Sequence, residues 1–143
     1  MIKRAILKDA TFIYKLAKEN LETTFPLETI KDYIKAKQTY HLFVCQKDEK
    51  IGFIILWESD FNGQIIDLVV KEKYRGLGYG KALLTYAVNF FEEIQVKQVS
   101  LEVNSTNQKA LKLYLNNGFE IKRLIKNYYQ TGDGLLLVRR LEK

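Results

Sequence analysis

Apolar residues recur along the chain with more than one period, and each change of period marks a change of secondary structure. The stretch Ile2 to Leu7 is typical of a short strand. Asp9 can cap a helix, and the apolar residues behind it recur every three to four positions, which predicts an amphipathic helix. A second helix is predicted over Pro26 to Lys37, because proline is favourable in a first helical turn.

The middle of the chain predicts three strands and a long helix. Apolar runs at Tyr40 to Gln46 and Ile51 to Glu58 are separated by a charged turn. Asn62-Gly63 is a strong turn dipeptide, so the next strand, Gln64 to Val70, is expected to pair antiparallel with its predecessor. A glycine-rich segment then leads into a helix with one apolar face that ends at about Ile94.

The last third of the chain predicts a strand, a helix and two closing strands. Apolar and polar residues alternate over Gln98 to Asn104, as in a half-buried strand. The helix predicted over Asn107 to Asn117 is followed by a glycine, which suits the left-handed position after a helix end. Phe119 to Lys126 and Leu135 to Leu141 flank a turn at Thr131-Gly132-Asp133-Gly134.

The predicted order of elements is βααβββαβαββ, which indicates a mixed α/β protein. A mostly antiparallel mixed sheet would carry helices on both faces, because each amphipathic helix must bury its apolar side. No linker, internal repeat or change of composition divides the sequence. We therefore expect residues 1–143 to form a single domain.

Composition excludes several kinds of site. With one Cys and one His in 143 residues, neither a disulfide framework, a Cys-based zinc site nor a histidine cluster can form, so no metal is expected. The same cysteine usage fits a reducing cytoplasm. No stretch approaches the roughly 18 apolar residues of a membrane span, and the charged N-terminus lacks a signal peptide's apolar run. The expectation is a cytoplasmic protein without a membrane partner.

The charge of the chain favours an anionic partner without choosing one. There are 23 Lys and Arg against 17 Asp and Glu, a formal net charge of +6. Phosphates and nucleic acid would both suit this surplus. Because the basic residues are spread along the chain, many with acids nearby, a direct nucleic-acid interface is not expected.

The glycine-rich segment has the character of a phosphate site. It reads Arg75-Gly76-Leu77-Gly78-Tyr79-Gly80, follows an apolar strand and opens a helix, whose first N–H groups are unpaired. Glycines let a phosphate approach that backbone, and Arg75 adds a positive charge. The spacing is not that of a Rossmann fold, and Gly80-Lys81-Ala82 lacks the Ser or Thr of a P-loop. The glycine-rich segment is therefore expected to bind another pyrophosphate-bearing ligand. The plainer alternative is a tight strand-to-helix turn that binds no ligand.

At these residues the chain resembles the GNAT superfamily of acyl-CoA-dependent N-acyltransferases. The superfamily's cofactor signature is Arg/Gln-x-x-Gly-x-Gly/Ala, which Arg75, Gly78 and Gly80 match. A second block has the spacing of the superfamily's cofactor-side helix, and consists of Asn107, Ala110, Leu113-Tyr114 and Gly118-Phe119. The predicted order of elements is also the GNAT order, so the resemblance covers essentially the whole chain. It implies the GNAT fold, acetyl-CoA as the acyl donor and no metal.

The resemblance also implies which residues hold acetyl-CoA. The strand before the glycines would pair with the pantetheine, and the N–H of Val70 would stabilise the oxyanion. The residues so assigned are Leu68, Val69, Val70, Arg75, Gly76, Leu77, Gly78, Tyr79, Gly80, Lys81, Asn107 and Tyr114. The plainer interpretations are a core strand for the first three and a helix N-cap for Asn107, and both kinds of role are compatible.

Two residues are candidates for proton transfer. Glu102 shares the polar face of its strand with Ser100 and Asn104. This segment resembles the N-terminal acetyltransferases of ribosomal protein S18 (the RimI type), which implies that Glu102 is the general base, directly or through water. Tyr114 would be the general acid for the CoA thiolate, since a phenol has a pKa near 10. A solvated Glu and a core Tyr are the plainer interpretations.

Two segments bear on which amine is acetylated. Phe25-Pro26-Leu27 lies where the protein N-terminal acetyltransferases that it resembles place an apolar substrate loop. Tyr128-Tyr129 is similar to the pair with which those enzymes hold a peptide's first residues. An α-amine has a pKa near 8 and a lysine amine one of about 10.4, so a single carboxylate suits the former. The expected reaction is acetylation of a protein N-terminus, with a ribosomal protein among the candidates, by direct attack in a ternary complex.

Other functions stay open at this point. A GNAT enzyme acting on a small-molecule amine, a polyamine or a lysine side chain would favour an acidic pocket, whereas the segments near Phe25 and Tyr128 are apolar and aromatic. A non-catalytic acyl-CoA-binding module would not need Glu102 and Tyr114. The expected partner is a protein or peptide N-terminus, and the expected state is a monomer or a weak homodimer. His41 and Cys45 are assigned no chemistry.

Overall fold

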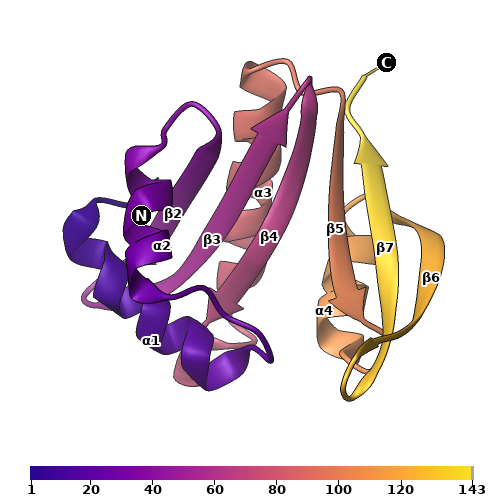
Figure 1. The fold of residues 1–143 in the computed structure, drawn as a ribbon, viewed down its shortest axis with the longest axis horizontal. Coiled ribbons are helices and arrows are strands. Elements are labelled where there is room, and N and C mark those ends of the chain that lie inside the picture. The colour runs from indigo at the N-terminus through magenta and orange to yellow at the C-terminus, as the bar shows by residue number, and fades with distance from the viewer. Residues whose placement is uncertain (143) are drawn as a thin grey trace.

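The computed structural model describes residues 1–142, which form one seven-stranded sheet with helices on both faces (Figure 1). The elements in chain order are β1 (Ile2–Arg4), the 3₁₀ turn η1 (Leu7–Asp9), α1 (Ala10–Asn20), α2 (Leu27–Lys35), β2 (Tyr40–Gln46), β3 (Lys50–Ser59), β4 (Asn62–Val70), the 3₁₀ turn η2 (Glu72–Tyr74), α3 (Tyr79–Glu93), β5 (Gln98–Asn104), α4 (Gln108–Leu115), β6 (Glu120–Tyr129) and β7 (Gly132–Arg140). The predicted order of strands and helices is confirmed.

The strands follow the order β1-β2-β3-β4-β5-β7-β6 across the sheet. Five of the described pairs are antiparallel, and β4 pairs with β5 in parallel, so the predicted mixed and mostly antiparallel sheet is also confirmed. A parallel pair requires a crossover connection, which α3 supplies between β4 and β5. The end of β4 and the start of α3 are therefore held close together.

Each face of the sheet buries its own apolar cluster. α1 and α2 cover one face, where residues such as Ile13 and Ile30 pack on Phe53 and Ile55 of β3. α3 covers the other face, with Phe91 among its fully buried residues. β3 is buried on both faces, because its side chains alternate between the two clusters. Figure 1 shows the same arrangement, with the sheet between the two layers of helices.

β4 and β5 separate part of the way along. They pair only over residues 62–64 and 98–100 of the described chain. The register between β3 and β4 shifts by one residue at Ile66, a bulge that bends β4. Beyond it β4 continues beside β3 to Val70, whereas β5 continues beside β7 to Asn104. The two strands therefore diverge toward their C-terminal ends (Figure 1).

Two turns differ from the prediction. The turn before β4 is formed by Asp60 and Phe61, with φ of 50° and 65°, rather than by Asn62-Gly63. Gly63 lies inside β4, where a Cβ would come within 2.7 Å of the Phe91 ring. Glycine therefore marks close packing there, which a turn dipeptide cannot reveal. The turn between β6 and β7 also lies earlier in the chain than the predicted turn over residues 131–134, because β7 begins at Gly132.

The N-terminal region differs in detail as well. The first strand ends at Arg4, and the Asp9 side chain accepts a hydrogen bond from Ile6 N at 2.9 Å instead of capping α1. Asp9 is buried and forms an ion pair with Lys50 Nζ at 2.7 Å. Asp9, predicted to cap the start of the first helix, thus ties the η1 turn to β3. Pro26 precedes α2 as its N-cap residue rather than lying in its first turn.

Close contact between β3 and β4 generates a stability prediction. A Cβ on Gly52 would lie 2.5 Å from the Val69 carbonyl oxygen, a backbone atom that cannot move without shifting β4. We expect Gly52→Ala to lower the free energy of unfolding by about 1–3 kcal/mol, measured by urea denaturation.

Gly80→Ala is the matched control, because its Cβ would meet only the Leu113 side chain, at 3.6 Å. Gly80 lies in the first turn of α3, where alanine is the better helix former, so the control should be neutral or stabilising. Wild-type stability of Gly52→Ala would contradict the close β3–β4 contact.

Candidate active site

A cavity of about 1020 Å³ opens where β4 and β5 diverge. Its walls come from four parts of the chain, namely residues 20–25 from the end of α1 onward, residues 64–68 of β4, the end of β5 with α4, and residues 127–131 from the end of β6 to the turn before β7. The Gln130 backbone N donates a hydrogen bond of 2.7 Å to Glu22 Oε1, which joins the first wall to the last. The cavity is therefore bounded by segments that are more than 100 positions apart in sequence.

The segment leading into the glycines is fixed by one carboxylate. Glu49, in the turn between β2 and β3, accepts hydrogen bonds from Lys71 Nζ and Tyr74 Oη, both at 2.7 Å. Lys73 Nζ lies 2.8 Å from the same carboxylate. These contacts lower the pKa of Glu49 to about 2. The chain therefore enters the glycine-rich segment from a fixed position beside β3.

Two glycines shape the start of α3. Gly76 and Gly78 have φ of 77° and 94°, a left-handed conformation that side chains strongly disfavour. No atom lies within 4 Å of where their Cβ atoms would be. The backbone here is therefore open to a ligand, and it leads directly to the unpaired N–H groups of the helix.

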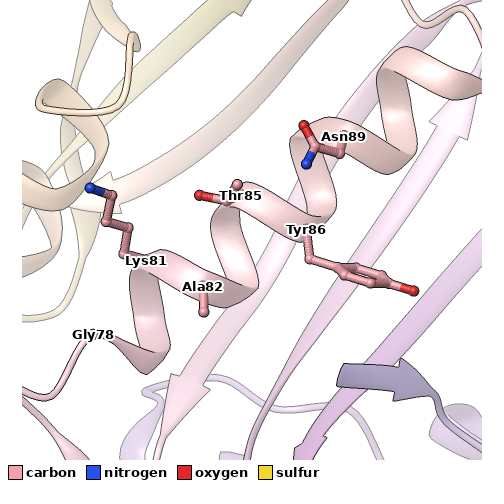
Figure 2. A pocket seen from close by; sticks show the side chains of 6 residues that line it. All are labelled: Gly78, Lys81, Ala82, Thr85, Tyr86 and Asn89. Carbon is pink, nitrogen blue, oxygen red and sulfur yellow. The ribbon is translucent and has the colours of Figure 1, made fainter. Parts of the chain in front are cut away.

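Arg75 precedes the start of α3 and Lys81 follows it, and their side chains make different contacts. Lys81 extends from α3 to the side opposite Tyr86, along a shallow hollow of about 440 Å³ (Figure 2). Arg75 instead binds within the protein, donating from Nε to Val70 O at 2.9 Å and from Nη2 to Asn20 Oδ1 at 2.6 Å. The Arg75 side chain thereby joins the end of β4 to the end of α1.

The sheet gap brings residues from both faces together. On β5, Leu101 and Val103 are buried in the cluster beneath α3, so Glu102 points to the face that carries α1 and α2. Tyr114 comes from α4 on the opposite side, with its ring edge against Phe119 at 5.8 Å. Both line the cavity. A carboxylate and a phenol from opposite layers of the protein therefore face one space.

Burial is the main cause of the raised pKa values of the cavity tyrosines. Tyr114 is 8% exposed, and burial followed by the charge of Asp67 raises its pKa well above 10. Burial and then Glu102 raise the pKa of Tyr129 to about 12. The pKa of Tyr128 also rises, through burial and then the Glu102 carboxylate. The Glu102 carboxylate therefore acts on two phenols, Tyr128 and Tyr129, that stay protonated at neutral pH.

Asp67 of β4 lines the cavity and was not among the residues predicted from sequence. Burial raises its pKa to about 6. A signal was available, since an acid interrupts the apolar run Ile65-Ile66-Asp67-Leu68-Val69. With Glu22 and Glu102 the cavity wall carries three acids, and its lining in the described chain has no Lys, Arg or His. The expectation of an apolar and aromatic pocket is therefore only partly right.

The predicted acceptor residues divide into two groups. Phe25, Tyr128 and Tyr129 line the cavity. Tyr128 and Tyr129 end β6 rather than lying in a loop, and their rings meet edge to face at 4.9 Å. Pro26 and Leu27 are outside the lining, because Pro26 is the N-cap of α2 and Leu27, its first residue, packs against the core under that helix.

The predicted cofactor residues divide in a similar way. Leu68, Asn107 and Tyr114 line the cavity. Val69 is buried in the cluster beneath α1 and α2, and Val70 packs on the opposite cluster, so neither side chain reaches the cavity lining. Asn107 caps α4, accepting a hydrogen bond from Ala110 N at 3.2 Å, as its plainer interpretation predicts. Any contact of the two valines with a cofactor would involve the backbone.

Residues 7–119 match the Acetyltransferase (GNAT) family. The chain is 29% identical to an uncharacterized N-acetyltransferase of Methanocaldococcus jannaschii, covering 98% of this chain and 91% of that protein. It is 28% identical to an N-alpha-acetyltransferase of Sulfurisphaera tokodaii, covering 96% and 90%. The fold is similar to the crystal structure of the ribosomal-protein-S18-alanine N-acetyltransferase from Escherichia coli, with a TM-score of 0.89, 22% identity, and coverage of 100% and 94%.

The chain therefore belongs to the GNAT family and is an N-acetyltransferase. Members of this family use acetyl-CoA. Within residues 1–142, no helix has both the length and the apolar character needed to cross a membrane. The same residues contain no group of three His, Cys, Asp or Glu side chains placed to hold a metal.

The unpaired Asp67 predicts a specific dependence of stability on pH. Its pKa rises from 3.8 in the unfolded chain to about 6 in the fold, so the folded state holds this proton more tightly. Wild-type protein therefore loses stability as pH rises from 4 to 6, by up to about 3 kcal/mol. Asp67→Asn removes this loss of stability. Its free energy of unfolding, measured by urea denaturation, should exceed that of wild type above pH 6 but not below pH 4.

Glu28→Gln is the control, because Glu28 is an exposed carboxylate on α2. Its difference from wild type should stay within about 0.5 kcal/mol across the same pH range. A difference between Asp67→Asn and wild type that does not change with pH would show that Asp67 titrates normally.

Proposed function

We propose that this enzyme transfers the acetyl group of acetyl-CoA to the α-amine of a protein N-terminus, by direct attack in a ternary complex. The observation that carries the proposal is that one cavity contains Glu102, Tyr114 and the Tyr128-Tyr129 pair. A base, an acid and an acceptor platform around one space suit a transfer between two bound substrates. The name of the Sulfurisphaera tokodaii relative supports an α-amine as the acceptor.

The residues present fit the acyl donor in three respects. β4 has no pairing partner on its β5 side after Gln64 in the described chain, which leaves backbone groups free for amides of an extended ligand. The open backbone at Gly76 and Gly78 leads to the N-terminus of α3, which suits a diphosphate. Tyr114 presents its hydroxyl to the same cavity. Acetyl-CoA would supply a thioester, and the Val70 N–H is our candidate for stabilising its oxyanion.

Two proton transfers complete the proposed reaction. Glu102 accepts a proton from the acceptor ammonium group, directly or through water, which leaves a neutral amine able to attack. Tyr114 donates its proton to the departing sulfur, and the phenol is restored by a proton from the new amide nitrogen. The raised pKa of Tyr114 keeps the phenol protonated until charge develops on the sulfur.

The acceptor would enter from the face of the sheet that carries α1 and α2. Glu102 points to that face, and the loop containing Phe25 lies on it. Phe25 packs edge to face on Tyr33 at 5.2 Å, and Tyr33 stacks on Tyr40 at 3.8 Å. This aromatic series fixes the position of the loop. We propose that Phe25 contacts the first side chain of the acceptor, while Tyr128 and Tyr129 bind its backbone.

A second candidate acceptor is a small cationic amine or polyamine. The acids in the cavity wall favour it, because a polycation needs several carboxylates and no nearby cation. Release of CoA should be followed with peptides of varied first residue, the same peptides with an internal lysine and a blocked N-terminus, and spermidine. We expect the free α-amine peptides to be the best substrates. Turnover of spermidine alone would replace the first candidate by the second.

Variants of the two proton-transfer residues test the mechanism. Glu102→Gln and Tyr114→Phe should each lower kcat about 100-fold or more, because each removes a general acid or base. Binding of CoA, measured by isothermal titration calorimetry, should stay within about threefold of wild type. Gln64→Ala is the control, since Gln64 lines the cavity where β4 and β5 are still paired. Wild-type kcat in both variants would refute the assigned roles.

A further inference from the structure

Two carboxylates that line the cavity, Asp67 of β4 and Glu102 of β5, point to the same layer from the two strands that border the gap in the sheet. Asp67 lies opposite Ile55 in the β3–β4 ladder, and directly opposed residues share a face. Ile55 packs in the cluster beneath α1 and α2, so Asp67 points to that layer. Glu102, between Leu101 and Val103, points to the same layer from β5. The bulge at Ile66 sets this orientation, since without it Asp67 would point to the opposite face.

Asp67 lacks any partner that would balance its charge. Among residues 1–142 no hydrogen bond or ion pair reaches its carboxylate, and the cavity lining contains no cation. Asp67 is partly buried, and even partial burial of a carboxylate without a partner is unfavourable, so folding alone does not favour an acid here. An apolar or amide residue would suit the site better. The position therefore fits a group whose partner arrives with the substrate.

A second group in the same cavity is also without a partner. Tyr114 is more than nine-tenths buried, and its hydroxyl has no hydrogen bond to any described residue. The charge of Asp67 acts on the pKa of Tyr114 and, more weakly, on that of Tyr129. Asp67, the proposed acid and the proposed acceptor platform all line the same cavity. An amine poised to attack a thioester beside Tyr114 would occupy this region.

We propose that Asp67 binds the ammonium form of the acceptor amine and is a specificity-determining residue for cationic acceptors. This inference rests on the proposed function only in that the acceptor is an amine. The two carboxylates then have separate roles, because Asp67 attracts and orients the ammonium group while Glu102 accepts its proton. Partial burial of Asp67 strengthens this contact, since a charge-assisted hydrogen bond is stronger where the local dielectric constant is lower.

The test compares Asp67→Asn with wild type in acceptor kinetics at pH 7.5. We expect KM for the acceptor to rise about tenfold or more, with kcat lowered less than threefold, because a binding contact is lost and the base remains. Asp67→Glu should recover most of the loss. Glu22→Gln is the matched control, because it removes the same charge at the rim and keeps an oxygen for Gln130 N. Its KM should stay within about threefold of wild type.

The pH dependence separates an ammonium contact from a structural role. The raised pKa of about 6 predicts that wild-type KM rises as pH falls through 6, whereas the KM of Asp67→Asn should show no such step. Unchanged KM in Asp67→Asn, or a fall in kcat alone, would overturn the proposal. So would an equal effect of Glu22→Gln, which would indicate general electrostatics instead of a specific contact.

A binding measurement makes the test independent of turnover. Wild-type enzyme saturated with CoA is titrated with an amine peptide, with the same peptide acetylated at its N-terminus, and with spermidine. Asp67 should favour the cationic ligands over the acetylated peptide by about tenfold, and Asp67→Asn should abolish the preference. If spermidine binds and peptides do not, the proposed N-terminal acceptor is wrong while the Asp67 role stands. Equal preference in wild type and Asp67→Asn would overturn the Asp67 role.

Discussion

The pairing of β4 with β5 over only three residues is the constraint on which the site depends. A continuous sheet would separate the layer of α1 and α2 from that of α3 and α4. The bulge at Ile66 bends β4 away, and both strands keep a partner on their other side, so the gap forms without leaving either strand unsupported. Close packing at Gly52 and Gly63 holds β4 in this bent position.

The gap explains why the two substrates of the proposed reaction can meet. The start of α3, shaped by Gly76 and Gly78, and the phenol of Tyr114 lie with the α3 and α4 layer, where they fit an acyl donor. Glu102 and Asp67 point to the other layer, where the amine would enter. Although the chain has a net positive charge, the described cavity lining contains three acids and no Lys, Arg or His, which suits an ammonium group.

The periodic features of the fold were predictable from sequence, and the irregular ones were not. Apolar periodicity located the β-strands and α-helices, and two residues singled out from sequence, Glu102 and Tyr114, line one cavity. The bulge at Ile66 carries no sequence signal, because it depends on how β3 and β4 pack. Asp67 could not be placed on the cavity side without that bulge. In sequence, a glycine required by a close contact, such as Gly63, cannot be told from a turn glycine, because both uses suit glycine.

Hydrogen–deuterium exchange with and without acetyl-CoA tests the central claim most directly, namely that the gap between β4 and β5 receives the acyl donor. The account predicts increased protection of the backbone amides in the second half of β4 and at residues 76–81, with little change in β1 and β2. Protection confined to other segments, or none at a saturating concentration of acetyl-CoA, would contradict it.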